Sequence, residues 1–408
     1  MIVVGLLALT RVVSVVPLPG VSGQQLANFF QANQALNLLN LFTGGGLMNI
    51  SIALMGVGPY ITASIIFQLL GYIIPSLESL QKEGEIGRQK INQYTRLAAV
   101  PLAIIQSFGT LTLLRNSGVI DSWNASSLLL MLTVSTAGTL FLMWIGELIS
   151  EYGIGNGMSL IITIGIIAGF ENSFAQTTRN VTAGGTSSLN LIVFLAVALI
   201  TLAVVVMVTE GVRNIPITYA RSTRGRGMLG RVNSTLPVKI NSAGVIPIIF
   251  AISLILIPSI AGQFFQKSAT LWIAHTAQFL VTVFDQRHWF YSLAYFVLVF
   301  AFSYFYTFII IKPEEMAENL QRQGGFVPGI RPGNDTAYFI YNVVNRLTFP
   351  GALFLGIIAI MPIAIQNMTK IQTISLGGTS ILIVVSVVLD TIRQIETQIA
   401  ARTYEHMA

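Results

Sequence analysis

The sequence predicts an all-α integral membrane protein with about ten transmembrane helices, arranged as two inverted five-helix halves with a short re-entrant helix. Of its 408 residues, 53% are hydrophobic and only 9% are charged, and the mean hydropathy is +0.74. A soluble domain carries roughly 25% charged residues, so this composition excludes an ordinary soluble protein. It also excludes intrinsic disorder, which requires low hydrophobicity. The apolar runs are continuous rather than alternating, which is typical of membrane helices and not of a β-barrel.

A transmembrane helix needs about 20 mostly apolar residues. Counting one shorter run at 157–170, the candidate spans are 1–17, 57–75, 97–114, 127–149, 157–170, 189–209, 242–262, 290–311, 349–366 and 376–392. The first run lacks a positively charged leading segment and a small-residue cleavage site, so we interpret it as a retained span and not as a signal peptide. An even number of spans places both termini on the same side of the membrane.

The basic residues predict the orientation of the chain. If the N-terminus is cytoplasmic, most of the 22 Lys and Arg residues fall in cytoplasmic segments. The positive-inside rule therefore predicts that both termini are cytoplasmic.

The cytoplasmic loop at about 210–240 divides the spans five and five. Because five is odd, two equivalent halves insert with opposite orientation, which is typical of an inverted repeat around a central pathway. We expect an N-terminal half at 1–188 and a C-terminal half at 189–408.

One apolar segment, at about 44–55, is too short to cross the membrane before Gly56-Val57-Gly58-Pro59 interrupts it. Irregular backbone at membrane depth survives only when it is buried in protein or lines a cavity. We therefore predict a half-helix that re-enters from outside, and an interfacial helix is the alternative.

The sequence contains few candidate catalytic residues. It contains no Cys, and its three His residues, His275, His288 and His406, all fall outside the predicted spans. A thiol nucleophile and an intramembrane Ser–His pair are thus unsupported, and we expect no enzymatic activity, cofactor or metal. Neutral polar residues inside the spans, such as Gln68, Gln106 and Asn241, are read from the residues alone as interhelical hydrogen-bonding groups.

Two long cytoplasmic loops, at about 210–240 and 312–346, carry many of the cations. The positive-inside bias explains the sign of their charge but does not require their length. Long ordered loops tend to carry function, so we expect them to dock a large acidic or nucleic-acid-bearing partner.

Several stretches resemble the SecY family of protein-conducting channels, and they run in order through nearly the whole chain. They are Val16–Gly20, Gly58–Leu70, Gly84–Ile91, Gly153–Gly157, Leu236–Pro247, Phe326–Gly333 and Gly377–Ser380. The resemblance implies an hourglass pore between the two halves, a plug that closes its outer funnel, and a lateral gate to lipid between spans 2 and 7. The re-entrant segment would be the plug.

The resemblance also implies roles for individual residues. The apolar pore ring would comprise Val57, Ile61, Ile162, Ile249 and Ile383. The plug would include Leu47, Ile50, Ile52 and Leu54, and the polar lateral-gate residues would be Thr62, Gln68, Gln106 and Asn241. Partner docking would involve Arg213, Arg221, Arg224, Arg226 and Arg331. Where the family pattern often has a basic pair, this chain reads Arg213-Asn214.

The implied partners are SecE-type and SecG-type small membrane subunits, a SecA-type ATPase, the ribosome, membrane lipid, and unfolded preproteins with signal sequences. The implied location is the plasma membrane, with the thylakoid membrane as the alternative. The rival function is an inverted-repeat secondary transporter of a small solute. An ion-coupled transporter usually needs an ionisable residue near the bilayer midplane, and the predicted spans hold almost none.

Overall fold

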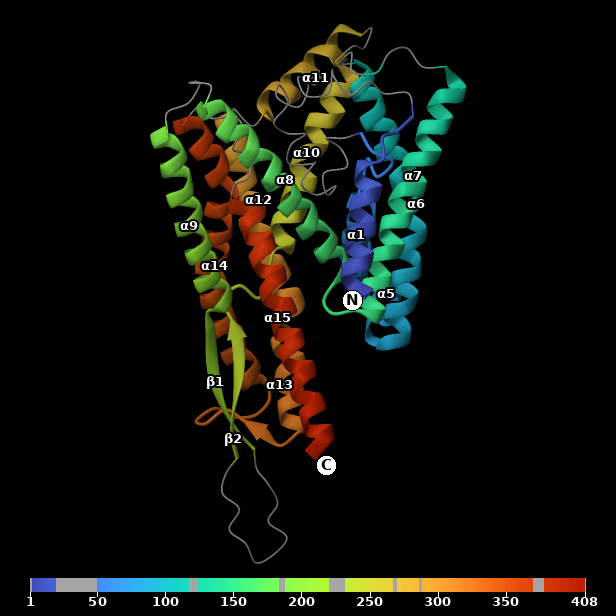
Figure 1. The fold of residues 1–408 in the computed structure, drawn as a ribbon. Coiled ribbons are helices and arrows are strands. Elements are labelled where there is room, and N and C mark those ends of the chain that lie inside the picture. The colour runs from blue at the N-terminus through green and yellow to red at the C-terminus, as the bar shows by residue number, and fades with distance from the viewer. Residues whose placement is uncertain are drawn as a thin grey trace, which may run out of the picture.

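The computed structural model describes residues 2–19, 50–116, 120, 124–182, 188–219, 232–266, 270–285, 288–369 and 378–407. Figure 1 shows a bundle of long helices with a β-hairpin projecting from one end. The helices are α1 (Ile2–Val15), α4 (Gly58–Ile73), α5 (Pro75–Lys82), α6 (Glu85–Asn116), α7 (Ala125–Tyr152), α8 (Gly157–Thr182), α9 (Ser188–Glu210), α10 (Ile246–Phe265), α11 (Leu271–Val283), α12 (Trp289–Ile310), α13 (Pro313–Arg322), α14 (Asn334–Thr369) and α15 (Gly378–Met407).

Each of the ten predicted spans coincides with one of these helices. Among the described residues, three helical stretches are by themselves long and apolar enough to cross a membrane: Ala125–Tyr152, Trp289–Arg322 and Asn334–Ile365. A fourth span is obtained if α4 and α5 are counted as one bent element. Most of the remaining predicted spans fall on helices in which the described apolar stretch is shorter than a full span. The others fall on α6 and α15, which continue beyond their apolar stretches.

The bend between α4 and α5 has a local cause. Ile74 is extended, with φ −101° and ψ 113°, and Pro75 follows it as the first residue of α5. The residue before a proline avoids the helical region, and proline is well suited to a first helical turn. The chain consequently turns by 102° between the two helices.

The structure adds a small sheet that the all-α prediction did not include. Strands β1 (Val212–Tyr219) and β2 (Val232–Lys239) form an antiparallel hairpin, and β3 (Gly325–Phe326) pairs with the other edge of β1. Ile215 and Ile217 of β1 are buried in a cluster with Val327 and Ile340, which belong to the later segment 312–346. Alternate apolar residues in an extended chain face one side of a sheet, which explains why this segment is stable as strands. The two predicted docking loops therefore share one folded unit.

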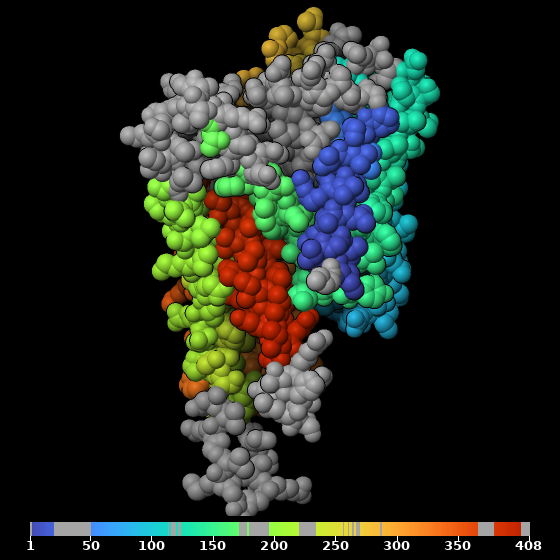
Figure 2. Space-filling model, viewed as in Figure 1, coloured from blue at the N-terminus to red at the C-terminus, as the bar shows by residue number. Residues whose placement is uncertain are grey.

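The main apolar cluster draws residues from both halves of the chain, including Val13 and Ile145 from the first half and Val299, Leu355 and Leu382 from the second. Figure 2 shows α15 lying along the seam between α9 and the helices near α1. The N-terminal end of α1, α5, the hairpin and the C-terminus point towards the same end of the bundle, and α11 lies at the opposite end (Figure 1).

Candidate functional site

All five predicted ring residues belong to this main cluster. Val57 caps the start of α4, and Ile162 on α8 and Ile383 on α15 are buried like it. Ile61, one turn into α4, and Ile249 on α10 are partly buried and pack against the same cluster. Four helices from both halves of the chain thus contribute these aliphatic side chains to one cluster. In a pore, a ring of such side chains would exclude ions, because aliphatic groups do not replace an ion's hydration shell.

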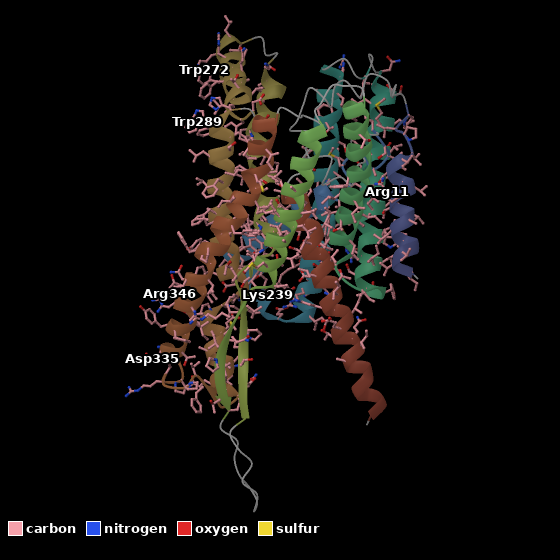
Figure 3. The ribbon with its side chains drawn as sticks, turned by 60° about the vertical axis from the view of Figure 1, so that its left-hand side comes forward. Arg11, Lys239, Trp272, Trp289, Asp335 and Arg346 are labelled. Carbon is pink, nitrogen blue, oxygen red and sulfur yellow. The ribbon has the colours of Figure 1, made fainter. Side chains whose placement is uncertain are left out.

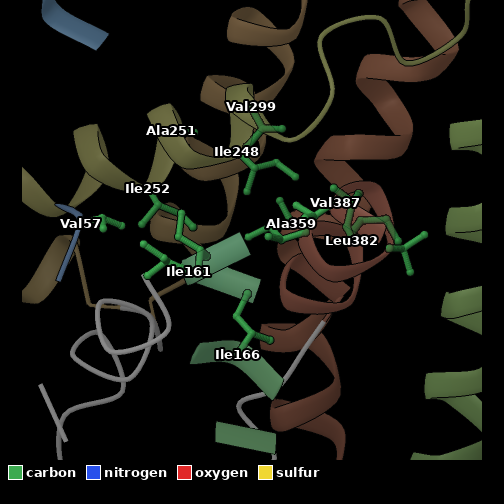
Figure 4. Close-up of a cluster of buried hydrophobic side chains, with 14 of the residues drawn as sticks. Val57, Ile161, Ile166, Ile248, Ala251, Ile252, Val299, Ala359, Leu382 and Val387 are labelled. Carbon is green, nitrogen blue, oxygen red and sulfur yellow. The ribbon is translucent and has the colours of Figure 1, made fainter. Parts of the chain in front are cut away.

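The cluster also contains neighbours that the sequence did not single out. Ile161 on α8 and Ile252 on α10 are buried within it, and Figure 4 shows both close to Val57. Ile248 on α10 and Leu382 on α15 are buried there as well. Adjacent aliphatic residues on an apolar helix give no periodic signal that would distinguish one facing the constriction from one facing a neighbouring helix.

The predicted plug segment is described only from residue 50, so Leu47 lies outside the described residues. Residues 50–57 form turns and a single β-bridge between Pro17 and Ser51, where the sequence predicted a helix at about 44–55. The Leu18 amide donates to the carbonyl of Ile50 at 2.7 Å, and the Ile52 amide donates to the carbonyl of Val16 at 3.0 Å. Two backbone hydrogen bonds therefore attach this segment to the end of α1.

The same segment also packs tightly against α6 and α7. Ile50 and Leu54 are fully buried in a satellite cluster with Leu111 of α6 and Met131 of α7. A Cβ atom built on Gly138 of α7 would lie 2.1 Å from the carbonyl oxygen of Ile52. Only glycine allows the backbone of α7 to approach residues 52–53 this closely.

Three of the predicted gate residues make hydrogen bonds, some within the first half of the chain and one to the second half. Gln106 of α6 donates through Nε2 to Oγ1 of Thr62 at 3.5 Å, and Thr62 donates to the carbonyl of Gly58 at 3.0 Å. These contacts lie within the first half of the chain. Gln68 of α4 instead accepts a hydrogen bond from the hydroxyl of Tyr306 on α12, which belongs to the second half.

Apolar contacts surround this hydrogen bond between the halves. Tyr306 packs at a tilt against Phe250 of α10, with ring centroids 4.9 Å apart. Ile65 and Leu69 of α4 pack on the same cluster, which also contains Phe302 of α12. The sequence did not identify Tyr306, because α12 carries many aromatic residues and only the fold shows which one meets Gln68.

Asn241 lies in the turn between β2 and α10. It is buried, and its Nδ2 group has no hydrogen-bond partner in the part of the chain that the structure describes. An unpaired buried amide destabilises the arrangement that buries it, because the group gives up hydration without compensation. Among the described residues, Nδ2 of Asn241 thus makes no gate hydrogen bond, and the role of Asn241 in a gate stays a prediction.

Two of the predicted docking arginines, Arg213 and Arg331, are described and lie at the hairpin end of the molecule. Arg213 is exposed on β1, and Arg331 is exposed in the loop that follows β3. The Arg331 carbonyl accepts a 2.8 Å hydrogen bond from the hydroxyl of Thr336. Gly329 and Gly333 on either side adopt φ values of 84° and 103°, a region that favours glycine. Three further predicted docking residues, Arg221, Arg224 and Arg226, lie outside the described residues.

Two ion pairs connect the base of the hairpin to α15. Glu210, the last residue of α9, accepts a 2.7 Å hydrogen bond from Arg393, and Lys239 at the end of β2 lies 3.9 Å from Asp390. The sequence identified no such pairs, because the partners are far apart in the chain. Within the described residues no group of three or more His, Asp or Glu side chains is arranged to hold a metal ion.

The bundle of long helices with a buried apolar cluster between its two halves shares its fold with solved protein-conducting channels. A structure described as that of a protein conducting channel aligns with a TM-score of 0.67 and 18% identity, covering 97% of this chain and 91% of that chain. A SecY structure, described as one in which the plug domain stabilises the closed state, aligns with a TM-score of 0.65 and 17% identity, over 97% of this chain and 91% of that chain. Canine Sec61 in a ribosome–channel complex aligns with a TM-score of 0.63 and 16% identity, over 97% and 91% respectively. At these identities the likeness shows the fold alone.

The chain belongs to the SecY family. The SecY family model matches residues 51–392. A protein translocase subunit SecY from Halalkalibacterium halodurans is 43% identical over 98% of this chain and 94% of the relative. The corresponding subunit from Streptomyces galbus is 42% identical over 97% of this chain and 93% of the relative. The resemblance inferred from the sequence is confirmed, and the chain is a membrane-embedded, protein-conducting channel subunit.

Proposed function

We propose that the chain is the central channel of a Sec translocon, which passes unfolded preproteins across the membrane and releases apolar segments sideways into lipid. The observation that carries the proposal is the contrast between two contact regions. The main apolar cluster, to which α4, α8, α10 and α15 bring the five proposed ring residues, contains mostly aliphatic side chains. The contact of α4 with α10 and α12 combines one neutral hydrogen bond with a small apolar cluster. An entering signal segment can replace such contacts with its own apolar surface.

The proposal includes the finer assignments that the sequence suggested. Val57, Ile61, Ile162, Ile249 and Ile383 form the pore ring, and the segment that includes Ile50, Ile52 and Leu54 acts as the plug. The halves 1–188 and 189–408 move against each other when the gate opens. The membrane is the plasma membrane. Both termini are in the cytoplasm, since described cations such as Arg213, Lys239 and Arg331 lie at the hairpin end.

The proposed partners follow from the two ends of the molecule. The exposed, cation-rich hairpin end suits a large cytosolic partner, either a SecA-type ATPase or a ribosome. Canine Sec61 was solved as part of a ribosome–channel complex. The fold that it shares with this chain supports the proposal that a ribosome binds here too. SecE-type and SecG-type subunits complete the assembly, and the energy for transport comes from the docked partner rather than from this chain.

A reconstitution experiment tests the proposal against the rival solute transporter. The chain, purified with its native membrane subunits, is placed in proteoliposomes with a cytosolic motor and ATP. We expect protease-protected import of a signal-bearing preprotein, and no import of the same protein without its signal. Uptake of small solutes without any preprotein import would contradict the proposed function.

A further inference from the structure

Helix α11 has a surface that the transport function does not explain. It lies at the end of the bundle opposite the hairpin (Figure 1) and contains no charged residue. Ala277 is buried on the side that faces α10, but Leu271, Trp272 and Phe279 are 78%, 76% and 66% exposed. Side chains of this size and polarity are rarely presented to water together. With 13 residues, α11 is about 20 Å long, which is too short to cross a hydrocarbon core of about 30 Å.

The hydroxyl groups on this exposed face do not depend on water. The Thr276 hydroxyl donates to the carbonyls of Trp272 and Ile273, both at 3.0 Å. The Thr282 hydroxyl donates to the carbonyl of Gln278 at 2.9 Å. Since these groups are satisfied within the helix, the face can lie against a largely apolar medium at little cost. His275 and Gln278 are also exposed, which suits the headgroup level better than the acyl core.

An exposed apolar stripe on α12 lies on the same flank of the molecule as Trp272 of α11 (Figure 3). Trp289 begins α12 and is 70% exposed, and Leu293 and Val297 follow it at four-residue spacing and are also exposed. Residues four apart lie on one side of a helix, so these three form a single stripe. Figure 3 shows Trp272 and Trp289 on the same flank of the molecule, at the end away from Asp335 and Arg346. Trp is enriched where membrane proteins cross the interface between lipid and water.

Tight packing links α11 to α10. A Cβ atom on Gly262 of α10 would lie 2.8 Å from both the Ala277 carbonyl oxygen and a methyl group of Val281. The end of α11 also contacts the start of α12, where the rings of Phe284 and Phe290 meet edge to face at 5.7 Å. A movement of this end of α10 therefore carries α11 with it.

We propose that α11 and Trp289 together bind the lipid surface of the leaflet that faces away from the hairpin. Leu271, Trp272 and Phe279 insert at the level of the headgroups and upper acyl chains. The helix thereby anchors one end of α10, the helix that carries Ile249 of the aliphatic cluster. The proposal rests on the membrane-embedded fold and on exposed side chains, and it does not depend on what the channel transports.

Quenching of tryptophan fluorescence in proteoliposomes tests this placement. The complex is prepared with Phe at Trp123, Trp144 and Trp289, so that Trp272 is the single reporter. Phospholipids brominated near the headgroup should quench Trp272 at least twice as strongly as phospholipids brominated near the chain end. A second chain that keeps only Trp144, which is exposed on the spanning helix α7, provides the reference for a deeper residue.

A matched pair of substitutions separates insertion from general loss of structure. In the chain with the single reporter, Phe279→Asp should lower quenching by the shallow brominated lipid at least twofold, because it places a carboxylate among acyl chains. Gln278→Asp adds the same charge one residue away, off the line of Trp272 and Phe279 and beside the polar His275, and should lower quenching less than Phe279→Asp does. Trp272 that is quenched by aqueous acrylamide but not by brominated lipid would overturn the proposal. Lipid quenching that appears only after the other membrane subunits are removed would also overturn it, since a protein partner would then cover the face.

Discussion

The hydrogen bond between Tyr306 and Gln68 can be removed without disturbing its surroundings. It joins α12 to α4, and so connects the second half of the chain to the first. Tyr306→Phe deletes only the hydroxyl and keeps the ring against Phe250, at a centroid distance of 4.9 Å. The variant therefore isolates the polar part of the contact between the halves.

The size of the effect follows from known side-chain hydrogen bonds between membrane helices. These average about 0.6 kcal/mol and reach about 1.7 kcal/mol. If the bond forms only when α4 and α12 are closed together, its loss lowers the ratio of closed to open gates roughly threefold, and at most about twentyfold. A change of this size is too small to unfold the protein but large enough to alter its selectivity.

The assay is export of a client whose signal sequence has been weakened. We expect Tyr306→Phe to raise this export about threefold, while export of the normal client changes little. Tyr304→Phe makes the same chemical change two residues earlier, where the ring contacts Phe300 and Phe308 of its own helix. If the two variants export the defective client equally, the Tyr306 hydroxyl does not hold the gate closed.

Three further predictions concern the constriction and the hairpin end. Ile383→Asn should hydrate the constriction and increase ion leak severalfold in single-channel recordings, while Val388→Asn, on the exposed side of α15, should not. Arg331→Glu should slow motor-driven or ribosome-driven translocation and change its salt dependence, and unchanged rates across a salt titration would show that Arg331 is not a docking residue. Arg393→Glu should increase protease cleavage of the hairpin by no more than a few-fold, because such exposed pairs contribute about 0–1 kcal/mol. The addition of Glu210→Arg should reverse the effect if the pair is the cause.

The sequence predicted the helices that are defined by apolar composition and missed those defined by local chain geometry. Each of the ten predicted spans falls on a helix because each is a continuous apolar run, and three or four of those helices are long and apolar enough to cross a membrane by themselves. Helix α5 was not predicted, since it is a short polar helix that exists where Ile74-Pro75 breaks α4. The strands β1 and β2 were missed because each is a short β-branched segment inside a loop assigned by its charge. Their stability comes from contacts with residues more than 80 positions later, such as Val327.

The residues of the candidate site were also predicted only in part. The ring residues were obtained through the family resemblance, and the structure places all five in one cluster, although their role in a pore stays a prediction. The partner of Gln68 and the ion pair between Glu210 and Arg393 could not be predicted, because both depend on how distant helices are rotated. Asn241 shows the opposite case, since the sequence predicted a hydrogen-bonding group and the described residues offer its Nδ2 none.

The chain order of the main cluster has a consequence for biosynthesis. Val57 enters the membrane early, Ile162 and Ile249 follow, and Leu382 and Ile383 arrive only with the final helix, α15. No incomplete chain can assemble the full constriction, because α15 supplies one of its sides. Contacts between residues more than 300 positions apart form late, after the intervening chain has been made. A nascent copy stalled before about residue 390 would therefore be a bundle with an unclosed seam. We expect a chain that ends before α15 to leave the apolar side chains that α15 would cover without their partner.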